Sequence, residues 1–400
     1  MPDHPPLLVL AASARAIARS CERAGRSPVC FDFFADADTP RVTRVDAEAT
    51  AVDRTPGTGP LIYGGGFENR PAVLARIART RPILGTTGPA LVAARGGFAA
   101  LSRQAGCRLP EETAVPPAGG DWWWKPTDSA GGCFGRDRQP GRRGRWQRHI
   151  DGESFGAAFL ATGHRPGLPE PPDVTPLGAA SLGAASLGAA SLDVELLGVV
   201  RQFPTGGRGK WPFFAMDLVH DPAAIVPDPI RRLAERLAAA GVSGPFGVDY
   251  LLTPGGEVVA LECNPRFTAG MELLERGCGR SIIGDWLDGP LRGGSTGPQS
   301  GGQSRPQSGG ANQPQSGGRE STVWGRRIVL ADRDLVSTLI PTDTRCDVPP
   351  PGTPVVRGQP WCSVFAAAET VERCRGRLTA AADAIARRSH SSGSPSRSIQ

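Results

Sequence analysis

The amino-acid sequence predicts a mixed α/β protein in three parts: a small N-terminal parallel-sheet domain (residues 1–90), a central domain (91–292) and a small β-rich C-terminal domain (321–388). Three observations lead to this prediction. Apolar strands and helix-prone segments alternate along the first part, which is typical of a parallel sheet. A hairpin pattern occupies the end of the second part. Short apolar strands follow a glycine-rich linker in the third.

The N-terminal domain opens with a strand, a helix and a second strand. Leu7–Leu10 is apolar, residues 14–24 are helix-prone and end at Gly25, and Val29–Phe34 is again apolar. A glycine-rich loop, residues 63–66, follows the next short apolar run. Because short loops join these segments, we expect a small sheet of parallel strands with helical connections.

Three further segments are predicted to lie outside the folded parts. Residues 177–191 repeat Leu-Gly-Ala-Ala-Ser, a period that matches neither strand nor helix, so we expect an inserted surface loop. Residues 293–320 repeat Pro-Gln-Ser-Gly-Gly with variations, as a flexible linker does. Residues 389–400 are rich in Ser and are predicted to be a disordered tail.

The composition narrows the classes of function. The chain of 400 residues has a net charge of +6, but its basic residues are 43 arginines and only two lysines, a general bias that is weak evidence for a nucleic-acid partner. No apolar span of 18 residues occurs outside the repeat, so a membrane-spanning helix is not expected. The nine cysteines contain no Cys-x-x-Cys pair, which favours reduced thiols and a cytoplasmic location.

One helix is predicted most clearly, from Pro229 to Ala240. Asp228 is placed to cap its N-terminus, and Gly241 suits its C-terminal end. One face carries an apolar stripe of Ile230, Leu233 and Leu237. We therefore interpret it as a packing helix without a chemical role.

Two carboxylates are predicted to face each other on a hairpin near the end of the central domain. A turn centred on Gly255-Gly256 pairs residues whose numbers add to 511, which places Asp249 opposite Glu262. Asn264 lies two residues beyond Glu262 and shares its face. Two facing anions repel, and a divalent cation removes that cost; all-oxygen ligands suit Mg²⁺ or Mn²⁺ together with substrate phosphates. The alternative is a solvated edge hairpin whose charges point at water.

A lysine followed by glycines is the second chemical feature. Lys125 ends an aromatic strand, and Gly131, Gly132 and Gly135 follow. Glycines let backbone N–H groups approach phosphate oxygens, and the lysine supplies a compact positive charge. The alternative is an ordinary turn with a chance lysine. His149, further along, is by itself more typical of a surface or packing residue.

Taken together, these motifs resemble the ATP-grasp superfamily over about residues 1–290. The order is an N-terminal α/β domain, Lys-Pro with Gly-Gly-x-x-Gly, a Gln-x-x-Ile-x-Gly hinge, and Asp…Glu-x-Asn-Pro-Arg. The resemblance implies a two-lobed ATP-binding domain, as in D-alanine ligases, biotin carboxylase and carbamoyl-phosphate synthetase. The C-terminal segment is similar to the small β-rich domain that ends some carboxylase-like members.

The resemblance also implies a role for each matching residue. Lys125 is expected to contact the α- and β-phosphates of ATP, and the flexible phosphate loop is expected to consist of Gly131, Gly132 and Gly135. The hinge that holds adenine through backbone groups is implied to be Gln147, Arg148, His149 and Ile150. The metal ligands are implied to be Asp249, Glu262 and Asn264.

Further roles follow from the resemblance, together with departures from the family pattern. Arg266 is expected to face the substrate or the transferred phosphoryl group, and Lys210 is either a second phosphate lysine or a surface residue. Many members have Glu where this chain has Gln147. The ribose-binding acid is Glu153 or is absent, with Ser154 at the usual offset.

An extra lysine that the family usually places before the glycine loop is missing from this chain. Arg95 is the nearest candidate to replace it, although the match is poor.

The implied activity is that of a carboxylate–amine ligase of the ADP-forming type. ATP and Mg²⁺ activate a small-molecule carboxylate as an acylphosphate, and an amine or thiol displaces phosphate. The acceptor is expected between the first domain and the hairpin, near Ser13, Arg15 and the loop 64–69 with Glu68. Two alternatives stay open: a biotin-carboxylase-like enzyme that forms carboxyphosphate, and a non-catalytic nucleotide-binding protein. No nucleic-acid or membrane partner is expected, and a homodimer is compatible with the resemblance.

Overall fold

The structure is a computed structural model, which describes residues 6–116, 119–127, 141, 143–162, 194–204, 216–288 and 322–391. The predicted insert 177–191 and linker 293–320 lie outside the described residues. So do Lys210 and three predicted loop glycines, Gly131, Gly132 and Gly135. The last helix continues to Ser391, three residues into the segment predicted to be a disordered tail.

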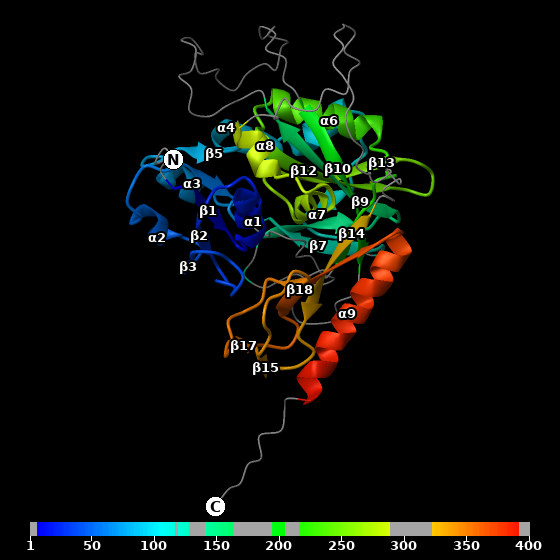
Figure 1. Ribbon diagram of the computed structural model, residues 1–400. Helices are drawn as coiled ribbons and strands as arrows, with labels where there is room; N and C mark the ends of the chain where they lie inside the picture. The colour runs from blue at the N-terminus through cyan, green and yellow to red at the C-terminus, as the bar shows by residue number, and fades with distance from the viewer. Residues whose placement is uncertain are drawn as a thin grey trace, which may run out of the picture.

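The N-terminal part is a parallel five-stranded sheet, as the alternating segments predict (Figure 1). Its strands are β1 (Leu8–Ala11), β2 (Val29–Asp32), β3 (Val42–Arg44), β4 (Leu61–Tyr63) and β5 (Ile83–Leu84), in the order β3-β2-β1-β4-β5. The helices along this part are α1 (Arg15–Arg23), α2 (Thr50–Asp53) and α3 (Pro71–Ile77). The strand order reverses between β1 and β4, so the loops after these two strands lie together at the switch point.

A large sheet of eight strands forms the body of the molecule, in the order β13-β12-β9-β10-β11-β14-β18-β16. Five strands come from the central part: β9 (Glu153–Ala161), β10 (Val194–Pro204), β11 (Met216–His220), β12 (Gly244–Leu252) and β13 (Val258–Asn264). Three come from the C-terminal part: β14 (Val323–Leu330), β16 (Arg345–Cys346) and β18 (Pro360–Ala368). Because β14 pairs with β11, the sheet continues without a break from the central into the C-terminal part.

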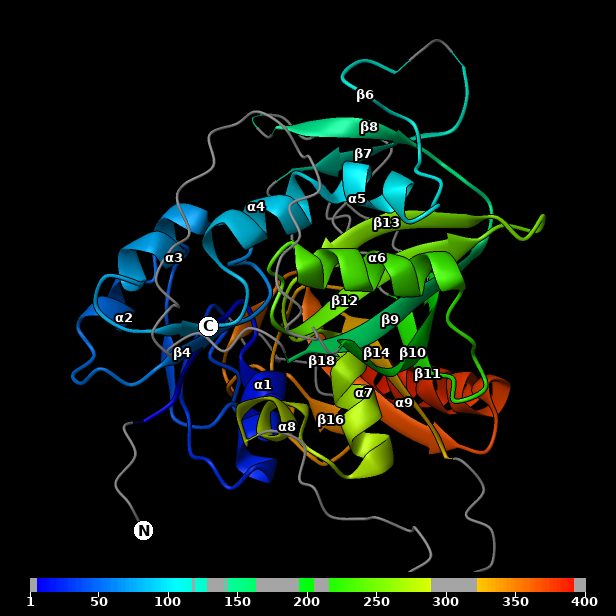
Figure 2. The same ribbon diagram turned by 90° about the horizontal axis from the view of Figure 1, so that it is seen from above.

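Two small sheets complete the strands. The first has the order β6-β8-β7 and consists of β6 (Glu112–Thr113), β7 (Trp122–Pro126) and β8 (Gly144–Arg148). Figure 2 shows this three-stranded sheet beyond β13, at one end of the molecule. The second small sheet pairs β15 (Leu335–Val336) with β17 (Pro354–Val355).

Helices cover the large sheet and leave part of one face for a cavity. On the opposite face, α6 (Asp228–Ala239) and α5 (Phe98–Gln104) pack against β9, β12 and β13 around one apolar core. The remaining helices are α4 (Gly88–Arg95), α7 (Ala269–Cys278), α8 (Ile282–Asp288) and α9 (Val371–Ser391). No described helix combines the length and the apolar composition that a membrane span requires.

Helix α6 confirms the predicted packing helix, with a different start. Ile230, Leu233 and Leu237 are completely buried in the core. The N-cap, however, is Pro227, and Asp228 is the first helical residue without a capping hydrogen bond from its side chain. The predicted cap was therefore wrong by one position, and the acidic side chain lies in the first turn, where it can still interact favourably with the helix dipole.

The β12–β13 hairpin pairs Asp249 with Glu262, as predicted, but the strand pairing next to the turn differs from the predicted one. Near the turn the paired numbers add to 510, as in Tyr250 with Ala260, and a bulge at Leu261 restores 511 beyond it. If the ladder continued without the bulge, Leu261 would lie opposite Asp249, and Glu262 would point into the core beside Ala260. Cys263 lies buried in that core.

Candidate functional site

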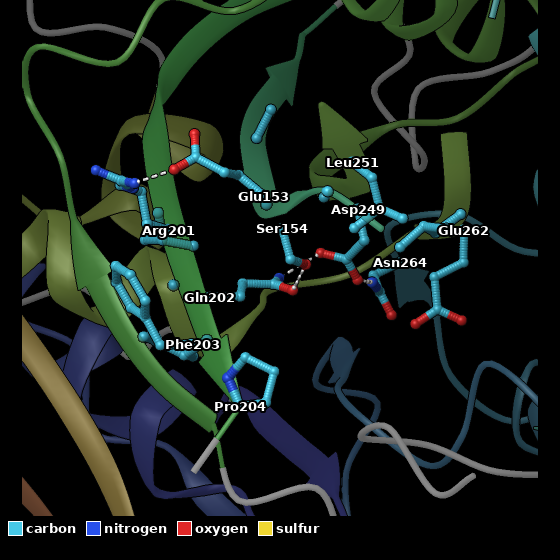
Figure 3. Close-up of a pocket in the computed structure, with 18 of the residues that line it drawn as sticks. Glu153, Ser154, Arg201, Gln202, Phe203, Pro204, Asp249, Leu251, Glu262 and Asn264 are labelled. Atoms are coloured by element: carbon cyan, nitrogen blue, oxygen red, sulfur yellow. Dashed lines mark hydrogen bonds and ion pairs between the residues drawn. The ribbon is translucent and has the colours of Figure 1, made fainter. Parts of the chain in front are cut away.

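A cavity of about 670 Å³ lies on the face of the large sheet opposite α6. Strands β9, β10, β12 and β13 form its floor, and β7, the segment after β8 and the start of α7 form its sides. A volume of this size is typical of sites for small molecules and cofactors. Figure 3 shows Asp249, Asn264 and Glu262 on one wall, with Gln202 reaching Asp249 from across the sheet.

The three predicted metal ligands lie together in this cavity. Both oxygens of Asp249 accept hydrogen bonds, Oδ1 from Gln202 Nε2 at 2.9 Å and Oδ2 from Asn264 Nδ2 at 2.8 Å. Glu262 Oε2 lies 3.1 Å from Lys125 Nζ. The hairpin and the aromatic strand, which are far apart in the sequence, thus bring two carboxylates, an amide and an ammonium group to one wall.

The two carboxylates titrate in opposite directions because their neighbours differ. Burial and the negative charge of Glu262 raise the pKa of Asp249 to about 6. Burial alone would also raise the pKa of Glu262, but the positive charges of Lys125 and Arg95 lower it to about 2. Asp249 is therefore the carboxylate whose ionised form a further cation would stabilise most.

Lys125 points into the cavity because its strand alternates. Trp122, Trp124 and Pro126 are buried on the far face of β7, so Trp123 and Lys125 face the cavity. The ring of Trp124 also meets that of Trp146 on β8 at 5.7 Å. Packed indoles thus fix the strand that carries the ammonium group.

The predicted hinge lines the other end of the cavity, where Gln147, Arg148, His149, Ile150 and Glu153 all contribute. The backbone N–H of His149 donates to the carbonyl oxygen of Asp121 at 2.8 Å. Glu153, the predicted ribose acid, forms an ion pair with Arg201 of β10 at 2.6 Å.

Arg266 lies on the cavity wall beside Asn264, and the N-terminal part holds it there. Its Nε donates to Glu68 Oε1 at 2.7 Å, and its Nη2 donates to Asn264 Oδ1 at 3.1 Å. Burial alone would lower the pKa of Arg266, but the carboxylate of Glu68 raises it. Glu68 Oε2 accepts from the backbone N–H of Gly66, so the loop after β4 aims this carboxylate at Arg266.

Arg15 was wrongly expected to line an acceptor site. Its side chain is about 1% exposed and makes a bidentate pair with Glu272 of α7, both contacts at 2.7 Å, and a bond to Asp347 at 2.6 Å. Ser13 also donates to Asp347. Neither residue lines the cavity.

Arg95, the nearest match to the missing lysine, braces the hairpin. Its Nη1 donates to the carbonyl oxygen of Cys263 at 3.0 Å, and its Nη2 donates to Asn69 Oδ1 at 2.9 Å. Its charge nevertheless reaches Glu262 and lowers the pKa of that carboxyl.

Sequence reasoning missed the residues that the large sheet brings in from a distance. Gln202 and Phe203 of β10, Arg326 of β14, and Thr268 and Gly270 at the start of α7 all line the cavity. Gln202 follows Val200 by two residues on a strand, which is the signal for a shared face. Which face that would be depends on the pairing of β10 with β9, which the sequence does not show.

Comparison with known proteins identifies the fold. No family model matches the sequence, and no curated protein resembles it in sequence. Solved structures do resemble it over nearly its full length. A carboxyaminoimidazole ribonucleotide synthase from Aspergillus clavatus, solved with ATP, has a TM-score of 0.60 at 12% identity and covers 96% of this chain and 100% of its own.

Two other structures are similar to the same extent. An L-amino acid ligase from Bacillus licheniformis has a TM-score of 0.57 at 14% identity and covers 95% of this chain and 98% of its own. The biotin carboxylase domain of a single-chain bacterial carboxylase has a TM-score of 0.57 at 15% identity, covering 95% and 88%. The chain therefore has the ATP-grasp fold, as its motifs predict.

Proposed function

We propose that the protein is an ATP-dependent ligase that activates a small-molecule carboxylate as an acylphosphate and transfers the acyl group to an amine or thiol. The observation that supports this most strongly is the contact of Lys125 with Glu262 at 3.1 Å, beside Asp249, in a protein with the ATP-grasp fold. A lysine facing a carboxylate pair is an arrangement that can hold a nucleotide's phosphates together with their metal ion.

The residues present fit Mg²⁺ or Mn²⁺. Asp249 and Glu262 supply carboxylate oxygens, and Asn264 supplies an amide. Burial and the negative charge of Glu262 raise the pKa of Asp249, and a bound cation would offset both effects. Among the described residues no group of three His, Cys, Asp or Glu side chains could hold a metal ion alone. Amide and phosphate oxygens would therefore complete the shell, as is usual for Mg²⁺. Bound Mg²⁺ would neutralise charge on the phosphate oxygens.

Different residues of the chain would bind the base, the ribose and the phosphates of the nucleotide. The hinge Gln147–Ile150 would take the base, with Trp123 and Leu251 as apolar walls. Glu153, paired with Arg201, would lie toward the ribose. Lys125 would exchange part of its contact with Glu262 for phosphate oxygens. Gly131, Gly132, Gly135 and Lys210, which lie outside the described residues, keep their proposed phosphate roles.

Arg266 would act at the substrate end. Glu68 and Asn264 hold its guanidinium group at the cavity wall, so it needs little rearrangement to meet a carboxylate or an acylphosphate. The far end of the cavity is lined by the start of α7 and by Phe203, Leu218 and Arg326. The acceptor would therefore enter past β10 and β14.

A second candidate is a carboligase that activates bicarbonate as carboxyphosphate. It is favoured by the similarity to the biotin carboxylase domain and by the C-terminal strands that extend the large sheet, Arg326 of β14 lining the cavity. Formation of ADP that depends on bicarbonate, without any organic acid, would identify this activity. Formation of ADP that depends on both a carboxylic acid and an amine would identify the ligase.

The test is a small-metabolite screen for ADP release by the wild-type protein and by Glu262→Gln. We expect Glu262→Gln to lose metabolite-dependent ADP release by about 100-fold or more, because it removes a proposed metal ligand. Glu257→Gln is the matched control, since Glu257 is exposed on the same hairpin and pairs only with Arg108 among the described residues. Equal ATP hydrolysis by wild type and Glu262→Gln would refute the assigned centre, and absence of any ADP release would favour a non-catalytic nucleotide binder.

A further inference from the structure

We propose that Gln202, held in one orientation by Ser154, is a positioning residue that fixes Asp249 for the metal–nucleotide complex. This inference rests on the proposed function and adds to it a residue that the sequence motifs do not contain. Three observations carry it: the path of Gln202 across a strand, the glycine beneath that path, and the hydrogen bond that orients the amide.

The contact between Gln202 and Asp249 crosses a whole strand. In the large sheet β9 lies between β10 and β12, with Ser154 paired to Gln202 on one edge and Gly156 paired to Asp249 on the other. Nevertheless Gln202 Nε2 lies 2.9 Å from Asp249 Oδ1. The long side chain of Gln202 therefore lies over β9 to reach a carboxylate two strands away (Figure 3).

The absence of a side chain at Gly156 makes this crossing possible. A Cβ atom at this position would lie 3.0 Å from Asp249 Oδ1 and 3.0 Å from Gln202 Nε2. It would also lie 3.3 Å from a methyl group of Val200. Any larger residue would thus push into the hydrogen bond itself, so glycine at this point of the strand is tied to the contact.

Ser154 determines which end of the amide meets Asp249. A glutamine amide can present either its oxygen or its nitrogen. Ser154 Oγ donates to Gln202 Oε1 at 2.8 Å, which leaves Nε2 as the donor to the carboxylate. With Oε1 turned inward, an oxygen would face an anion, which is repulsive.

Asp249 is therefore held at both oxygens, by Gln202 at Oδ1 and by Asn264 at Oδ2. Partners of this kind orient a metal ligand, and their replacement typically weakens metal binding by about 10- to 100-fold. Arg266 and Glu68 continue the chain of hydrogen bonds beyond Asn264, so the carboxylate lies within one connected set of side chains.

The experiment is calorimetric titration of ATP into the full-length protein, once with excess Mg²⁺ and once with EDTA. We expect Gln202→Met, which keeps the length but removes the donor, to weaken Mg²⁺-ATP binding about tenfold or more and metal-free ATP binding by less than about twofold. Ser154→Ala should weaken Mg²⁺-ATP binding in the same direction by about threefold. Gly156→Ala should weaken Mg²⁺-ATP binding by about the same factor as Gln202→Met, because the added methyl group would disturb the same hydrogen bond. The control is Gln104→Met, at an exposed position on α5.

The outcomes separate this inference from the proposed function. Wild-type ATP binding that does not depend on Mg²⁺ would refute both. Metal-dependent binding by the wild type that Gln202→Met leaves unchanged would overturn the positioning role alone. So would an equal loss with Mg²⁺ and with EDTA, because a merely structural residue would weaken both. If Gln202→Met fails to fold, as circular dichroism would show, Ser154→Ala decides the question by the same comparison.

Discussion

Lys125 is the residue on which the charge balance of the cavity depends. Its ammonium group is the cation in contact with Glu262, and together with Arg95 it keeps that carboxyl ionised. Burial and the negative charge of Glu262 raise the pKa of Asp249. A lysine in contact with one carboxylate of a facing pair is thus suited to a ligand that brings a divalent cation and several phosphate oxygens.

Replacing Lys125 with Met should weaken Mg²⁺-ATP binding by about tenfold or more, because a charge-assisted contact to phosphate is lost. Lys125→Arg should have an affinity for Mg²⁺-ATP between those of wild type and Lys125→Met, since it keeps the charge but not the compact ammonium group. Titration with a fluorescent ATP analogue measures both. Equal affinity of wild type and Lys125→Met would contradict the assigned phosphate contact.

The sequence predicted single residues well where they lie on one hairpin or one strand. Asp249 and Glu262 are paired, as predicted from the hairpin turn, and Lys125 joins them from β7. Arg15 was misplaced because its partners, Glu272 and Asp347, lie more than 250 and 300 residues away. No local pattern shows that a charged residue at the start of a helix will be buried against such distant carboxylates.

In the β12–β13 hairpin, the predicted pairing of Asp249 with Glu262 depends on a bulge that was not predicted. The turn is closed by a hydrogen bond between Thr253 and Glu257, with Gly256 at φ +79°. Next to the turn the numbers of paired residues therefore add to 510, not to the predicted 511. The bulge at Leu261 then adds the missing residue. Bulges depend on packing against neighbouring strands and helices, which hydrophobic alternation alone does not show.

Leu233 lies on the apolar face of helix α6. Leu233 is completely buried between α6 and the large sheet. Leu233→Ala should lower the free energy of unfolding by about 3 kcal/mol through lost apolar contact and a residual cavity. Urea denaturation checks it, with Glu235→Ala on the exposed face of the helix as the control. A loss no greater than that of the control would mean that α6 is not packed as described.

The whole molecule is held together by buried charges where its three parts meet. Arg15 of the N-terminal part pairs with Glu272 of α7 and with Asp347 of the C-terminal part, and Asp347 also pairs with Arg326. Burial alone would raise the pKa of Asp347, but the two guanidinium groups hold it far below its usual range. The start of α7 and Arg326 both line the cavity, so this network links the arrangement of the parts to the site.

Asp347→Asn should destabilise the protein by about 3 kcal/mol, because it removes the negative charge that pairs with the buried Arg15 and the partly buried Arg326. Asp343→Asn, an exposed position in the same loop, should change stability by less than about 0.5 kcal/mol. Chemical denaturation at pH 7 measures both. Equal effects of the two variants would show that the network does not join the parts.

The buried carboxyl group of Asp36 should make the stability of the fold depend on pH. Burial, with the charges of Asp347, Asp32 and Asp38 opposed by Arg15, raises its pKa to about 8 from an ordinary value of 3.8. A carboxyl whose pKa is higher in the folded state keeps its proton on folding, so its contribution to stability is present below about pH 4 and is lost as pH rises toward 8. Asp36→Asn should therefore be more stable than wild type at pH 8, by roughly 5 kcal/mol, and nearly equal to it at pH 4. Thermal melting at several pH values checks this, and parallel curves for the two proteins would contradict it.

Crystals grown with Mn²⁺ and a non-hydrolysable ATP analogue would show by anomalous scattering at the manganese edge whether Asp249 and Glu262 bind the metal ion of the nucleotide. We expect a manganese peak about 2.1 Å from oxygens of Asp249 and Glu262, with the Lys125 ammonium group in contact with the phosphates. A nucleotide bound elsewhere, or manganese that contacts neither carboxylate, would contradict it.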